Sequence, residues 1–185
     1  MKRFILCLSL FCFAISISTA QKANVRPTLD KISGEAVKAP KSPLASSYMQ
    51  KGDAYVRVVY SQPHLRGRDM LGGKNPYGKM WRLGANQATE IFLTKDIKIG
   101  GEELEAGAYS MFAIPNADSW TLVFSNQLGQ WGAYNYDESQ DALRLEVKVQ
   151  KAPKTFEAMS IWFGDEGEAI NFAWGEAWVN VPIAL

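Results

Sequence analysis

Residues 143–149 read LRLEVKV, and this stretch shows the pattern that decides the fold class. Leu143, Leu145, Val147 and Val149 alternate with charged residues, so an extended chain would place all four on one face. A period of two residues is typical of a strand with one face buried and the other in water. The stretch therefore predicts a half-buried antiparallel strand.

Short apolar segments of the same kind, separated by turn residues, recur along most of the chain. Further strands are expected at 46–49, 54–60, 91–93, 97–99, 109–114, 120–124, 159–163, 170–174 and 178–183. No segment shows a long helical period, although a short helical turn is expected near 136–141. The regular spacing of about nine or ten short strands predicts an all-β fold, a Greek-key-like antiparallel β-sandwich.

Residues 104–109 read LEAGAY and match the Leu-x-x-Gly-x-Tyr pattern of a tyrosine corner. In Greek-key sandwiches the hydroxyl of this tyrosine bonds to backbone a few residues upstream and fixes the crossover between strands. We therefore expect a structural role for Tyr109.

The N-terminus has the organisation of a secretory signal. Two basic residues, Lys2 and Arg3, precede an apolar run over 4–17 and the small residues of 18–20. This run is too short to span a bilayer, so we expect a signal peptide over residues 1–20 rather than an anchor. The mature protein is then secreted or periplasmic and has no transmembrane segment.

The domain organisation follows from composition. Residues 21–43 are rich in Lys, Ala, Ser and Pro, which indicates a flexible linker. Residues 44–185 are expected to form a single β-sandwich domain, long enough to bury a core without disulfides.

Composition excludes several classes of site. Both cysteines, Cys7 and Cys12, lie in the signal, and His64 is the single histidine. Ordinary zinc sites need several such ligands, so zinc is close to excluded. An all-oxygen calcium site stays open at the acidic clusters 137–138 and 165–168, but neither has the spacing of a known calcium loop, so we expect no metal and no cofactor. The whole chain carries a formal charge of +1, which argues against nucleic acid as a partner.

Residues 66–90 read RGRDMLGGKNPYGKMWRLGANQATE and break the alternating pattern. Arginine forks hold carboxylate or phosphate groups, and flat aromatic faces stack on sugars. A long loop with aromatic content also tends to be functional. We expect a site for a small anionic or carbohydrate ligand, formed by Arg66, Arg68, Tyr77, Trp81, Arg82, Asn86 and Trp131.

Two alternatives concern the same stretch. In the first, the arginines bond the loop's own carbonyls or pair with Asp69 and Glu90, while Trp81 fills the core beneath. In the second, the protein is a hydrolase that uses His64 or a carboxylate with the arginines holding charge, although binding is favoured over catalysis.

A third alternative is a structural or assembly module that binds another envelope protein. It would use a long edge strand, or an exposed apolar patch containing Trp174 or Trp178.

The chain resembles the domain-of-unknown-function family numbered 2911, whose members are secreted or envelope proteins of Gram-negative bacteria. The resemblance covers residues 44–185 and is carried by the motifs at 66–68, 76–79, 81–89, 97–101, 106–112 and 130–134. It implies secretion, a compact β domain and a central role for the Arg-Trp-Asn stretch. The family has no established activity, so the resemblance carries over no catalytic residue.

Overall fold

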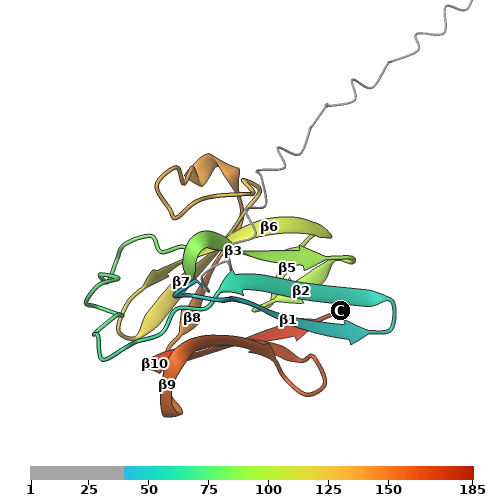
Figure 1. Cartoon of the computed structure of the whole chain (residues 1–185). Coiled ribbons are helices and arrows are strands. Elements are labelled where there is room, and N and C mark those ends of the chain that lie inside the picture. Colours follow the sequence, from blue (N-terminus) through green and yellow to red (C-terminus); the bar gives the residue numbers. More distant parts are fainter. Residues whose placement is uncertain (1–39) are drawn as a thin grey trace, which may run out of the picture. The chain divides into compact units, whose positions relative to one another are not determined.

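The structure is a computed structural model that describes residues 40–185 (Figure 1). The predicted signal peptide (1–20) and most of the predicted linker (21–43) lie outside the described residues. The strands are β1 (Leu44–Lys51), β2 (Ala54–Ser61), β3 (Ala85–Leu93), β4 (Ile97–Ile99), β5 (Glu102–Leu104), β6 (Gly107–Pro115), β7 (Ser119–Ser125), β8 (Asp141–Lys148), β9 (Gln150–Phe163) and β10 (Ala169–Ala184).

These strands form two antiparallel sheets that face each other as a sandwich, which confirms the predicted fold class. The larger sheet has the order β1-β2-β3-β6-β7-β8, and the smaller has the order β5-β4-β10-β9. The chain passes between the sheets after β3, after β5 and after β8. No helix of the described part is long and apolar enough to cross a bilayer.

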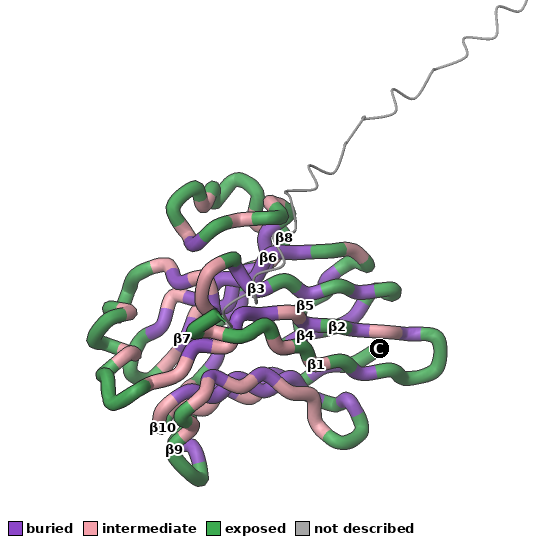
Figure 2. The backbone as a smooth tube through the Cα atoms, in the orientation of Figure 1, coloured by how far each residue is buried: buried purple, intermediate pink, exposed green. Residues whose placement is uncertain are grey.

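Alternating burial explains why these segments form strands. In β8, Leu145 and Val147 are buried whereas Arg144 and Glu146 are exposed, as the period of two predicts. Figure 2 shows the same alternation of buried and exposed positions along other strands. The buried faces of the two sheets meet in one apolar core.

Three indole rings join the irregular segment to this core. Trp81 stacks on Trp174 of β10 with ring centroids 5.5 Å apart, and meets Trp120 of β7 edge to face at 5.8 Å. All three side chains are buried. Burial of rings this large contributes heavily to stability, so residues near Trp81 are held firmly against the sandwich.

Two local predictions are confirmed. The Tyr109 hydroxyl donates to the Glu105 carbonyl at 2.9 Å, which is the expected tyrosine corner. A 3₁₀ turn, η1 (Glu138–Gln140), lies within the segment predicted to be a helical turn.

Other boundaries differ from the prediction. β3 begins at Ala85, inside the stretch expected to be irregular, and β5 was not expected. The two strands predicted at 170–174 and 178–183 are one strand, β10, with register shifts on both sides of Gly175. This glycine has φ +62°, so it forms a bulge where the sequence suggests a break.

Candidate functional site

The segment from Gln62 to Gly84 crosses one end of the sandwich and is attached to both sheets (green trace in Figure 1). At its start, Leu65 N–H donates to Glu157 O of β9 at 2.8 Å, and Met159 N–H donates to Pro63 O at 2.9 Å. At its end, Trp81 exchanges two hydrogen bonds with Ala113 of β6, at 2.7 and 2.8 Å. The predicted irregular stretch is therefore an ordered crossing.

This arrangement depends on a divergence of β3 from β6. The two strands pair from Leu93 back to Thr89, whose partner in β6 is Met111. Two residues further along β6, the partner of Ala113 is Trp81. The first residues of β3 pair with the loop after β7 instead. There, Gly132 N–H donates to Asn86 O at 3.0 Å. The divergence brings the segment 81–86 and the loop around Gly132 together.

The backbone of this region is strained in places. Arg66, Leu83 and Asn86 are non-glycine residues with φ between 49° and 57°. Such conformations cost free energy and persist only where the surroundings hold them. At Leu83 the side chain is fully buried, and the carbonyl accepts a hydrogen bond from Thr89 Oγ1 at 2.6 Å.

Each of the three arginines donates to main-chain carbonyls. Arg66 Nη2 bonds to Lys41 O. Arg68 bonds through Nε to Leu65 O at 2.9 Å and through Nη2 to His64 O at 2.7 Å. The Arg68 contacts are to the loop's own carbonyls, as the first alternative expected, whereas the Arg66 contact ties the loop to the segment before β1.

Arg82 combines a backbone contact with an aromatic one. Its Nη1 donates to Asn86 O at 2.9 Å, and its guanidinium carbon lies 5.9 Å from the centroid of the Tyr134 ring. Gly132 makes this approach possible, because a Cβ at this position would lie 2.7 Å from the Tyr134 ring and 3.5 Å from Arg82 Cζ.

Two neighbouring clefts meet at Arg82. The first, which we call the lysine cleft, has a volume of about 230 Å³ and is lined by Lys74, Asn75, Pro76, Lys79, Met80, Trp81, Arg82, Ala133 and Tyr134. The second, which we call the arginine cleft, has a volume of about 200 Å³ and is lined by Ser42, Pro63, Arg68, Met70, Asn75, Trp81, Arg82, Gly84, Ala85, Asn86 and Trp174. They share Asn75, Trp81 and Arg82 as wall residues, so the two clefts are neighbours.

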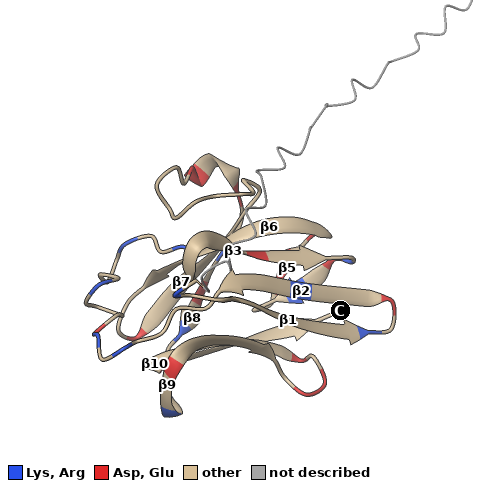
Figure 3. Cartoon of the chain, in the orientation of Figure 1, with Lys and Arg blue, Asp and Glu red and all other residues tan. Residues whose placement is uncertain are grey.

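The charge of this region is one-sided. The linings contain the cations Arg68, Lys74, Lys79 and Arg82 and no carboxylate. Within residues 40–185, none of the four has a carboxylate within ion-pair distance. Figure 3 shows basic positions distributed along the crossing segment at this end of the sandwich, with one acidic residue, Asp69, also on this segment. The region presents positive charge that no acidic side chain of the described chain compensates at contact distance.

Trp174, which lines the arginine cleft, carries an unpartnered donor. Its Nε1–H is buried and has no hydrogen-bond partner in the described structure. By contrast, Trp81 Nε1 donates to Gly84 O at 3.0 Å. Leaving a buried donor without an acceptor is unfavourable, so this indole N–H lowers the stability of the fold at the wall of the cleft.

The predicted site residues divide into three groups. Arg68, Trp81, Arg82 and Asn86 line the arginine cleft, although Trp81 is only 5% exposed and is mainly a core residue. Tyr77 lines a third cleft of about 340 Å³, together with Arg68, Trp174 and the acidic Asp69 and Glu176. Arg66 and Trp131 line none of these three clefts.

The seven predicted site residues do not include Lys74, Lys79, Tyr134 and Trp174, although Tyr134 was expected to offer a flat face for stacking. Both lysines lie in the unpatterned stretch, so their position in the sequence could have identified them as candidate site residues. Trp174 was expected only as a marker of an exposed apolar patch, but it is 1% exposed. Its place in the cleft depends on the pairing of β9 with β10, which the local sequence does not reveal.

The residues of the hydrolase alternative lie elsewhere. Neither His64 nor Glu90 lines the two clefts. Glu90 Oε1 accepts a hydrogen bond from Gly129 N–H at 3.0 Å. Among residues 40–185, no group of three or more His, Cys, Asp or Glu side chains is placed to hold a metal ion.

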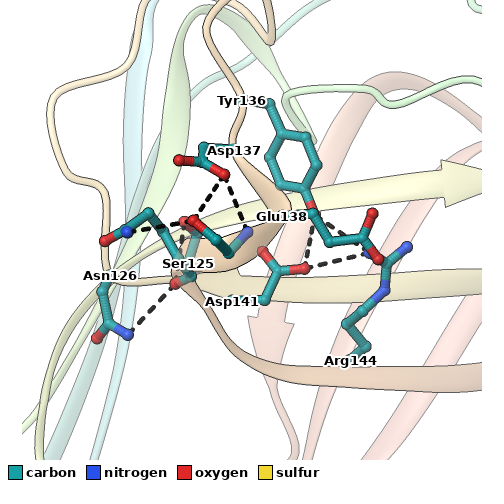
Figure 4. Close-up of polar contacts among 9 residues, drawn as sticks. Ser125, Asn126, Tyr136, Asp137, Glu138, Asp141 and Arg144 are labelled. Carbon is teal, nitrogen blue, oxygen red and sulfur yellow. Dashed lines mark hydrogen bonds and ion pairs between the residues drawn. The ribbon is translucent and has the colours of Figure 1, made fainter.

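A polar cluster fixes the base of the loop that carries Tyr134 (Figure 4). Tyr136 Oη donates to Asp141 Oδ2 at 2.6 Å, and Arg144 Nη1 reaches Tyr136 Oη and Asp141 Oδ2, both at 3.2 Å. The Asp141 side chain is 8% exposed, and this burial raises the carboxyl pKa above its usual value despite the bonds from Tyr136 and Arg144. The Tyr136 ring packs against the buried Phe112 at 5.2 Å.

Comparisons with known proteins give a family. The family model described as "Protein of unknown function (DUF2911)" matches residues 42–183. No curated protein and no solved structure matches the chain.

Proposed function

We propose that this chain, which belongs to the family of proteins of unknown function DUF2911, binds a small anionic ligand at the lysine and arginine clefts. The observation that carries this proposal is the set of four cations that line the two clefts without a carboxylate among them. Gathering like charges around a concave surface is unfavourable in the empty protein, so it points to an anion that relieves the repulsion.

The volumes indicate the size of the ligand. Clefts of about 230 and 200 Å³ suit a small molecule rather than a folded partner. Tyr134 is 78% exposed and stands at the wall of the lysine cleft, where its free face is open to a sugar ring. An anionic sugar derivative would therefore use both the cations and the aromatic wall.

The arginines are positioned before any ligand arrives. The backbone bonds of Arg68 and Arg82 hold each guanidinium in place and use only part of its five donors. A ligand that meets fixed side chains loses less conformational entropy on binding than one that must order them. The structural contacts of these arginines thus favour binding.

We place this function outside the cytoplasm, in the periplasm or the medium, on the strength of the predicted signal peptide over residues 1–20. The identity of the mature N-terminus tests this part of the proposal.

Binding is tested by thermal unfolding in the presence of inorganic phosphate, citrate and sugar phosphates. A ligand at one hundred times its dissociation constant adds about 2.7 kcal/mol, which raises the midpoint of a domain this size by about 5–10 °C. The Lys79→Gln variant should reduce this shift, because it weakens one of the two clefts. Lys148→Gln removes the same charge from an exposed position outside both clefts and should keep it. Equal loss in both variants would show unspecific attraction.

The assembly alternative keeps one supporting observation. Trp174 is buried and Trp178 is half-buried, so the expected apolar patch is absent at Trp174. However, β1 is an edge strand whose Leu44 and Tyr48 side chains are exposed. Sedimentation of the protein with and without Tyr48→Lys would reveal association through this edge as a loss of the larger species in the variant.

A further inference from the structure

We propose that the lysine and arginine clefts form one two-lobed site for a small molecule that carries two phosphate groups, with Arg82 between them. This inference rests on the proposed anion-binding function and specifies its ligand class. Two observations support it: the division of the region into two lobes and the charge of the linings.

The division into lobes follows from the lining residues. Lys74 and Lys79 line only the lysine cleft, while Arg68 and Trp174 line only the arginine cleft of the pair. Arg82 lines both. Each lobe therefore has cationic donors of its own, and the shared guanidinium can contact a group in either lobe.

The charge of the linings favours phosphate over carboxylate. The four cations carry four positive charges. Two carboxylates would supply only two negative charges, whereas two phosphate monoesters supply about three to four at neutral pH. A bisphosphate therefore balances the charge of the empty site most closely.

The arginine lobe has the donors that a phosphate needs. Phosphate oxygens accept several hydrogen bonds, and planar arginine forks match their geometry. Arg68 lies in this lobe with its guanidinium fixed by two carbonyls. A phosphate in this lobe would accept hydrogen bonds from the Arg68 N–H groups that the carbonyls leave free, which a neutral apolar ligand could not do.

The two lobes are tested with a matched pair of probes, fructose 6-phosphate and fructose 1,6-bisphosphate, by calorimetric titration of the purified protein. We expect one bisphosphate per chain, bound at least about tenfold more tightly than the monophosphate, since a second charge-assisted contact typically contributes this much or more. Lys79→Gln and Arg68→Gln probe the two lobes separately, and Lys148→Gln serves as the charge-matched control.

The variants distinguish a two-lobed site from simple attraction. Each single variant should lower bisphosphate affinity to near that of the monophosphate, because losing either lobe removes the second contact. The double variant should bind both probes more weakly than either single variant, because it also weakens the contact that remained. The Lys148→Gln protein should retain the preference.

Several results would overturn the proposal. If the two probes bind with equal affinity, or if only one of the two cleft variants loses the preference for the bisphosphate, the site has a single lobe. If Lys148→Gln lowers the preference by the same amount, the preference arises from net charge and not from the clefts. Failure of the anion-binding function itself would look different, since neither fructose phosphate nor inorganic phosphate would then bind. Circular dichroism of each variant confirms that the fold is intact.

Discussion

Trp81 and Trp174 stack with ring centroids 5.5 Å apart and an interplanar angle of 17°, although they differ in hydrogen bonding. The Trp81 indole donates to Gly84 O, whereas the Trp174 indole has no partner in the described structure. Both rings therefore belong to the core, and Trp174, which also lines the arginine cleft, keeps a buried donor without an acceptor. The stack links the crossing segment to β10 and joins the stability of the fold to the candidate site.

Truncating Trp81 should destabilise the protein strongly. Trp81→Ala leaves a cavity beside Trp120 and Trp174, and removal of a buried aromatic side chain typically costs about 3–5 kcal/mol. Urea unfolding measures this loss. Tyr134→Ala removes a ring that is 78% exposed and should cost far less. Similar losses in the two variants would contradict the placement of Trp81 in the core.

The tyrosine corner gives a smaller and more specific effect. Tyr109→Phe removes the hydroxyl that donates to Glu105 O and keeps the ring, so it should lower the free energy of unfolding by about 0.5–1.5 kcal/mol. The same unfolding experiment checks the value. An unchanged midpoint would mean that this hydrogen bond does not stabilise the crossover.

Gly132→Ala should perturb the site through Tyr134. The residue has φ +73°, and an added Cβ would lie 2.7 Å from the Tyr134 ring. Backbone strain of about 1 kcal/mol is expected from the alanine alone, and displacement of Tyr134 from Arg82 should weaken anion binding in addition.

Gly129→Ala is the matched control for this change. Gly129 has φ +70° and open space around the added Cβ, so it shares the strain without the clash. If both variants weaken anion binding equally, the contact between Tyr134 and Arg82 has no part in the site.

Asp141 makes stability depend on pH in a direction opposite to that of a typical salt-bridged carboxylate. Its pKa in the folded protein is raised above the ordinary 3.8 by burial, so between these two values the folded state binds more protons than the unfolded state. Its contribution to stability is therefore greatest at low pH and is lost as the pH rises through the raised pKa.

Unfolding measured from about pH 3 to pH 7 should show this contribution as a difference between wild type and Asp141→Asn. Asp137 gives the opposite sign, because hydrogen bonds from Ser139 lower its pKa and stabilise the folded protein above 3.8. If Asp141→Asn leaves the pH profile unchanged, the buried carboxyl does not titrate as described.

Export should remove the N-terminal segment. Mass spectrometry of the protein from its native compartment is expected to find Gln21 as the first residue, because cleavage follows the small residues of 18–20. A protein that retains Met1 and remains in the cytoplasm would contradict the proposed location.

Alternation and turn residues were sufficient to predict the fold class, because burial follows a period of two in strands such as β8. They were insufficient at Gly175, where a glycine reads equally well as a break or a bulge. They also missed the start of β3 at Ala85, since its pairing with the segment around Gly132 is decided by contacts distant in sequence.

The candidate site was predictable only in part, for a similar reason. The position of Arg68, Arg82 and Asn86 in an unpatterned loop pointed to the cleft that they line. The sequence could not reveal that Arg66 turns to Lys41 O or that Trp174 reaches the cleft from another sheet. Both depend on the packing of the crossing segment against β9 and β10.

The most direct test of the anion-binding site follows the six tryptophan indole N–H signals by ¹⁵N–¹H NMR during titration with inorganic phosphate. The Trp174 signal, assigned with Trp174→Phe, should shift saturably, because Trp174 lines the arginine cleft that phosphate is proposed to enter. The Trp81 signal should change much less, because its bond to Gly84 O is already made. A titration in which the Trp174 signal stays fixed at saturating phosphate would contradict the account, as would shifts confined to the exposed Trp131.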